Sequence, residues 1–121
     1  QSRDSFSKGW KVLWTTLWID PERINDSSSR EFIIFGAFDD YAYIYINGKK
    51  VNKRFAAGWG RNGERRNQIT LKKKDWLYPG NNFILIHAKN TGGPGMVCMG
   101  MSSVYQDGAH WDDILVNTNV S

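Results

Sequence analysis

The sequence predicts an all-β fold, namely an antiparallel β-sandwich or jelly roll of about eight strands. Aromatic residues, which favour strands, are abundant: there are six Trp, five Tyr and six Phe in 121 residues. Twelve glycines and turn dipeptides such as Asn47-Gly48 and Pro79-Gly80 divide the chain into short segments. No segment has convincing helical periodicity, and the strand–helix–strand order of a parallel nucleotide-binding sheet is absent.

Turn and loop residues bound each expected strand. In chain order, we expect strands over residues 9–19, 31–38, 41–46, 49–55, 68–71, 83–90, 96–105 and 114–120. The segment 31–38 is almost continuously apolar, which is typical of a strand covered on both faces. The segments 41–46 and 83–90 alternate between two kinds of side chain, so each should present two different faces.

The alternation over 41–46 separates tyrosines from aliphatic residues. Tyr41, Tyr43 and Tyr45 share one face, and the residues between them suit a sandwich core. Aromatic rings offer flat apolar surface to the C–H faces of sugars, so the tyrosine face, with Tyr43 at its centre, is a candidate binding platform. The alternative is that these tyrosines are half-buried and pair across strands with residues such as Phe83 or Leu85.

Size and composition indicate a single domain over residues 1–121. Cys98 lies among apolar neighbours and is expected to be a small buried hydrophobe rather than a reactive thiol. No run approaches the roughly 18 apolar residues of a membrane-spanning helix. Sequons at Asn25 and Asn119 favour a secreted or cell-surface protein.

Four segments occur in a characteristic order and spacing: WTTLWI (14–19), EFIIFGAF (31–38), DDYAYIYINGKKV (39–51) and ITLKKKDWLYPGNNFILIHAKNTGG (69–93). Through these segments most of the chain, roughly from Gly9 to Met101, resembles the galactose-binding-domain-like β-sandwich modules found beside glycosidase catalytic domains and in lectins and adhesins. The resemblance implies a sandwich fold and a non-catalytic role, which in such modules is often carbohydrate binding and in others that of a spacer or docking surface.

Asp39 and Asp40 are candidate ligands of a structural calcium ion, the one cofactor that the sequence suggests, because Ca²⁺ prefers several carboxylate and carbonyl oxygens. Asp112 and Asp113 would contribute if their loop lies nearby. The alternative is that the Asp39-Asp40 pair bonds backbone amides before the strand begins. Glycoside cleavage needs two carboxyl groups about 5–10 Å apart across a sugar, whereas adjacent strand residues point to opposite faces. The sequence therefore predicts that the chain is not an enzyme.

Positive charge is concentrated in one segment. Lys49–Lys74 holds ten basic residues and one acid, Glu64, although the whole chain has a net charge of only +4. Such a segment would attract acidic glycans, nucleic acid or anionic lipid. The alternative is a solvated edge, because lysines protect edge strands from pairing with other chains. Nucleic acid is the less favoured partner, since Phe55 and Trp59 are the only aromatic residues of this segment that could stack on bases.

Two loops carry aromatic and charged residues together. In GWGRNGERR, Trp59 could stack on a sugar and arginines could hold an anionic group; these arginines are Arg61, Arg65 and Arg66. In DGAHWDD, the candidates are His110 and Trp111. For both loops the alternative is that the indole anchors a packed loop.

These observations predict a non-catalytic carbohydrate-binding or adhesion module of a larger secreted or surface protein, with acidic glycans as candidate ligands. The alternative function is a structural or protein-interaction module that contacts neighbouring domains without binding sugar.

Overall fold

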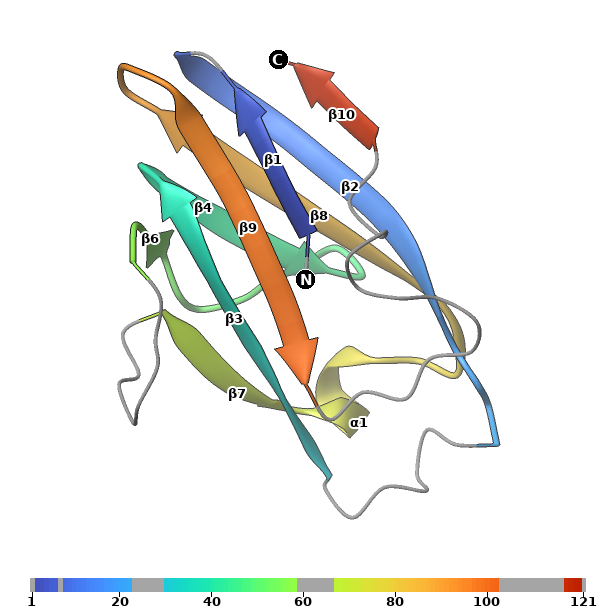
Figure 1. The fold of residues 1–121 in the computed structure, drawn as a ribbon. Helices are drawn as coiled ribbons and strands as arrows, with labels where there is room; N and C mark the ends of the chain where they lie inside the picture. Colours follow the sequence, from blue (N-terminus) through green and yellow to red (C-terminus); the bar gives the residue numbers. More distant parts are fainter. Residues whose placement is uncertain (1, 7, 23–29, 59–66, 103–116, 121) are drawn as a thin grey trace.

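The computed structural model describes residues 2–6, 8–22, 30–58, 67–102 and 117–120, and in them the chain forms two antiparallel sheets that pack face to face (Figure 1). The predicted all-β sandwich is confirmed. One sheet has the spatial order β1 (Ser2–Phe6), β9 (Gly95–Ser102), β3 (Glu31–Asp39) and β7 (Gln68–Lys72). The other has the order β10 (Asn117–Val120), β2 (Gly9–Ile19), β8 (Gly80–Asn90), β4 (Tyr41–Ile46) and β5 (Lys49–Lys50), with β6 (Phe55–Ala56) also pairing with β4.

The core lies between the sheets and takes alternate residues from β2, β3, β4, β8 and β9. β2, β4 and β8 contribute aliphatic side chains, and β3 contributes Phe32, Ile34 and Phe38. Phe55, from β6, is also buried in the core, and its ring centroid lies 5.5 Å from that of Phe38. Cys98 is buried in β9, as the sequence predicted.

β3 is an apolar strand that contains one glycine, Gly36, at a position with no space for a side chain. A Cβ at this position would lie 2.6 Å from both the Phe38 ring and the backbone oxygen of Cys98. Glycine therefore lets the Phe38 ring lie directly over its own strand. The prediction that residues 31–38 are covered on both faces was wrong in part, because Ile33 and Phe35 on the outer side are only half-buried.

Short elements differ most from the sequence-based prediction. The single return strand expected over 49–55 is two separate pairs of residues, β5 and β6. Residues 2–6 form an unexpected strand, and Lys73–Trp76 form one helical turn, α1. Local alternation predicts elements of this length poorly, because their pairing partners decide whether they form.

Two asparagines join the Asn47-Gly48 turn to the start of β8. The Asn47 side chain donates to the backbone oxygen of Trp76 and to Oδ1 of Asn82, and it accepts the N–H of Phe83. Asn82, which is 1% exposed, also exchanges two hydrogen bonds with the backbone of Tyr78. The turn and β8 are thus held together by side-chain amides that satisfy buried backbone groups.

Two further buried asparagines organise other turns. Asn67 accepts the N–H of Ala56 at 3.1 Å and donates to the oxygens of Ala56 and Gly58. Asn90 donates to the oxygen of Gly93 at 2.7 Å. In the described part of the chain, no helix has the length and apolar character needed to cross a membrane.

Candidate functional site

The outer surface of the sheet that contains β2, β8 and β4 is covered by aromatic and apolar side chains. We call this surface the aromatic face. Its side chains come from three neighbouring strands and are Trp10, Val12, Trp14, Tyr41, Tyr43, Tyr45, Phe83, Leu85, His87 and Lys89. They alternate with the core residues of the same strands, so the sheet separates an aliphatic inner side from an aromatic outer side.

Strand register aligns these side chains in rows across the sheet. Trp10, Lys89 and Tyr41 form the first row. Val12, His87 and Tyr43 form the second row. Trp14, Leu85 and Tyr45 form the third row, and Phe83 lies one step further along β8. Residues far apart in the chain thereby become neighbours, about 5 Å apart between adjacent strands.

The rings contact one another within and between rows. Trp10 stacks on His87 with centroids 4.2 Å apart and a tilt of 31°, and it meets Tyr41 edge-on at 5.9 Å. Trp14 and Phe83 lie 5.6 Å apart. These distances are typical of favourable aromatic pairs, so the rings of these pairs are held in place by one another.

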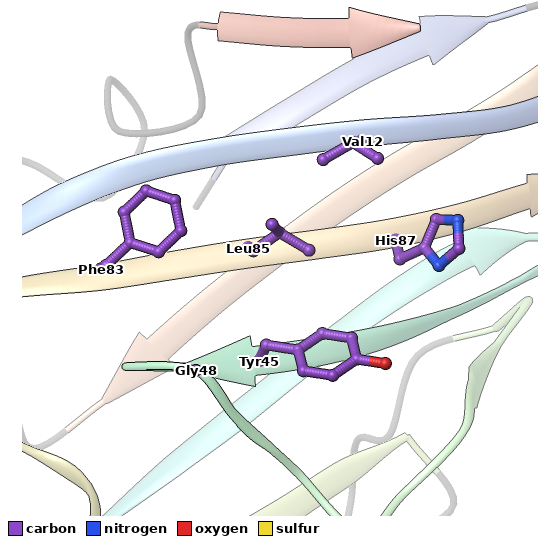
Figure 2. A pocket seen from close by; sticks show the side chains of 6 residues that line it. All are labelled: Val12, Tyr45, Gly48, Phe83, Leu85 and His87. Atoms are coloured by element: carbon purple, nitrogen blue, oxygen red, sulfur yellow. The ribbon is translucent and has the colours of Figure 1, made fainter. Parts of the chain in front are cut away.

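A hollow of about 320 Å³ lies in this face (Figure 2). It is lined by Val12, Tyr45, Gly48, Phe83, Leu85 and His87. Gly48 lies at the turn with φ 81°, and a Cβ there would meet no atom within 4 Å, so this side of the hollow is open. The volume is at the lower end of the range of small-ligand sites. The lining is apolar apart from the Tyr45 hydroxyl and the His87 ring nitrogens.

His87 is the titratable group of the hollow. Partial burial lowers its pKa below the ordinary value of 6.5. The imidazole is therefore neutral at pH 7, with one nitrogen that donates and one that accepts. Its ring stacks on Trp10, so His87 is a packed residue of β8.

This lowered pKa predicts a loss of stability in mild acid. As the pH falls below about 6.5, His87 becomes protonated in the unfolded chain while it stays neutral in the folded chain. The free energy of unfolding therefore decreases with falling pH until the pH is below the folded-state pKa of His87. Urea unfolding at pH 7.5, 6.5, 5.5 and 4.5 should show a smaller decrease for His87→Gln than for the wild type. Equal decreases in the two proteins would contradict this assignment.

Three cations lie against rings of the aromatic face. The Nζ of Lys89 is 5.1 Å from the Trp10 ring centroid, and that of Lys50 is 4.1 Å from the Tyr43 ring centroid. The Arg54 guanidinium lies 4.9 Å from the Tyr41 ring centroid. Such contacts are favourable for both partners.

The basic segment does not gather on one surface in its described residues. Lys50 and Arg54 border the aromatic face, whereas Lys72 is exposed on β7, an edge strand of the other sheet. Lys72 thus fits the solvated-edge interpretation. Lys73 does not, because it is buried, and burial lowers the pKa of its amine.

Of the predicted binding residues, the structure places Tyr43 in the middle of the aromatic face. The structure agrees with the alternative interpretation of the tyrosines, since they are half-buried and Tyr45 pairs with Leu85. A binding role for the tyrosine face stays a prediction. The remaining candidates lie outside the described residues: Trp59, Arg61, Arg65, Arg66, His110 and Trp111.

Of the Asp39-Asp40 pair, Asp40 has a structural role just before β4. One carboxylate oxygen of Asp40 accepts the Thr91 N–H at 2.6 Å and the Thr91 hydroxyl at 2.5 Å. These hydrogen bonds lower the pKa of Asp40. No group of three or more potential metal-ligating His, Cys, Asp or Glu occurs among the described residues, and Asp112 and Asp113 lie outside them. The calcium site stays a prediction.

Sequence reasoning assigned no binding role to Trp10, Trp14 or His87. The alternation in WKVLW, with Trp10 and Trp14 in phase, was a signal that these rings share one face. This alternation does not predict that Trp10 and Trp14 align with the tyrosines of β4, because β8 lies between β2 and β4.

Comparison of the chain with protein-family models, with curated proteins and with solved structures finds no match.

Proposed function

We propose that this chain is a non-catalytic carbohydrate-binding module of a larger secreted or cell-surface protein, and that the aromatic face is its binding surface. The observation that carries the proposal is the hollow flanked by aligned rings on three neighbouring strands. A pyranose ring has an apolar C–H face and an edge of hydroxyls. The first suits stacking on rings, and the second suits polar groups at fixed positions.

The hollow supplies both kinds of contact. Phe83 and Leu85 offer apolar surface, and the Tyr45 hydroxyl can donate to or accept from a sugar hydroxyl. Neutral His87 adds one donor and one acceptor. The lining has no carboxylate that could serve as an acid or a nucleophile for glycoside cleavage. Its residues therefore support binding without catalysis.

Phe83→Ala is expected to weaken glycan binding strongly. Phe83 lines the hollow and is 40% exposed, so truncation removes contact area for a ligand while leaving the core unchanged. Loss of an aromatic anchor costs about 2 kcal/mol, or about 30-fold in affinity. A glycan array that includes neutral, sialylated and sulfated glycans would identify a ligand, and calorimetric titration would measure the loss.

Tyr78→Ala is the matched control, because Tyr78 is 62% exposed and is no part of the aromatic face. It should bind like the wild type. Trp59→Ala and Arg61→Ala test the loop that the sequence suggested. If these two abolish binding while Phe83→Ala does not, the binding site is the loop and not the aromatic face. An array without any ligand would refute the proposed function.

A structural or protein-interaction module is the second candidate. It is favoured by Val12 and Leu85, whose aliphatic side chains lie at the centre of the face and would also suit a neighbouring protein surface. In that case the array would be blank, and sizing of the longer parent protein with Phe83→Arg would show a change in its compactness or assembly.

A further inference from the structure

We propose that the aromatic face selects acidic sugars, with the sugar ring in the hollow and its carboxylate or sulfate held by Lys50 and Lys89. This inference rests on the proposed function and adds the ligand class. It follows from where the positive charges of the face lie relative to the hollow.

Lys50 is adjacent to the hollow. It pairs in register with Tyr45, which lines the hollow, and it follows Gly48 and Lys49 around the turn. Its ammonium group is held 4.1 Å from the centroid of the Tyr43 ring. A group bonded to a sugar ring stacked beside Tyr45 would therefore meet the Lys50 ammonium at the rim.

Lys89 provides positive charge on the opposite side of His87. It lies in the first row between Trp10 and Tyr41, two residues along β8 from His87. Arg54 adds a guanidinium over Tyr41 in the same row. The three cations are already held against rings, so less side-chain freedom is lost when they contact an anion.

The charge of the face is not balanced by acids of its own. None of the ten side chains that define the aromatic face is a carboxylate. The acid nearest in sequence, Asp40, precedes Tyr41, and its carboxylate is hydrogen-bonded to Thr91. Three cations without carboxylates in their rows favour an anionic partner over a neutral one.

Polygalacturonate and its fully methyl-esterified form make a matched pair of probes, because esterification removes the charge and keeps the sugar. Chondroitin sulfate and dextran sulfate test sulfated sugars, and neutral galactan, xylan and dextran are the uncharged panel. Affinity electrophoresis with each polymer, followed by calorimetry, would measure binding by the wild type and by Lys50→Gln/Lys89→Gln. We expect the double variant to bind an acidic polymer about 10-fold more weakly or worse.

Lys72→Gln/Lys74→Gln has the same net charge as the test variant and removes two exposed lysines away from the aromatic face. It should retain affinity within about twofold of the wild type. Equal losses in the two double variants would show attraction by overall charge and would overturn the inference. Equal binding of esterified and free polymer would overturn it while leaving carbohydrate binding intact. Failure of every polymer, charged or neutral, would refute the proposed function as well.

Discussion

Replacing Phe38 by alanine is expected to lower the free energy of unfolding by about 3–5 kcal/mol, the usual cost of emptying a buried phenylalanine site. Phe38 is 0% exposed, and its ring packs against Phe55 and over Gly36. Because domains of this size have about 5–15 kcal/mol of stability, the variant should be close to unfolding.

Equilibrium unfolding in urea would measure this loss, with Phe83→Ala as the control. Phe83 is the same residue type but lies on the outer side of β8 at 40% exposure. Its truncation removes the contact with Trp14 and should cost about 1 kcal/mol. A loss at Phe83 equal to or greater than that at Phe38 would contradict the assignment of inner and outer sides of the sandwich.

Asn82→Ala is expected to cost about 2–4 kcal/mol, although it removes only one small polar side chain. The Asn82 amide accepts from Tyr78 N at 2.8 Å and from Asn47 Nδ2 at 2.9 Å, and it donates to the backbone oxygens of Tyr78 and Gly80. Alanine would leave buried donors and acceptors without partners. It would also loosen the link between the 47–48 turn and β8, and this link holds Gly48 and Phe83 at the hollow.

Asn81→Ala is the matched control, because Asn81 is the preceding residue and is exposed. Its effect on urea unfolding should stay within about 0.5 kcal/mol. The Asn82 variant should also show faster amide hydrogen exchange at Phe83, whose N–H bonds to Asn47. If the two variants are equally stable, the amide network contributes little to the fold.

The fold was largely predictable because strand alternation is local. In YAYIYI the order of side chains assigns Ile44 to the core and Tyr43 to the outer side, and the structure confirms both. Asn47-Gly48 was correctly read as a turn, since Asn47 has φ 52° and Gly48 φ 81°. The role of Asn47 in binding β8 was not predictable, because its partners Trp76 and Phe83 lie about 30 residues away in the chain.

The candidate site was predictable only in part. Tyr43 was identified from its strand alone, whereas the hollow needs β2, β8 and β4 side by side. The sequence predicted binding sites in the basic and Trp-bearing loops because charged residues and indoles stand close together there along the chain. The aligned rows have no such local signal, since each row takes one residue from each of three distant segments.

The sequence by itself determined the class of fold, the Asn47-Gly48 turn and the two-sided character of the alternating strands β4 and β8, because these depend on neighbours along the chain. Only the tertiary structure decided which strands lie side by side, and therefore which outward-facing side chains share one surface. Strand neighbours are set by packing across the whole sandwich and by long-range register, which a period of two does not encode. That register places Trp10, Tyr43 and His87 on one surface, and it turns three separate alternating strands into a single candidate binding face.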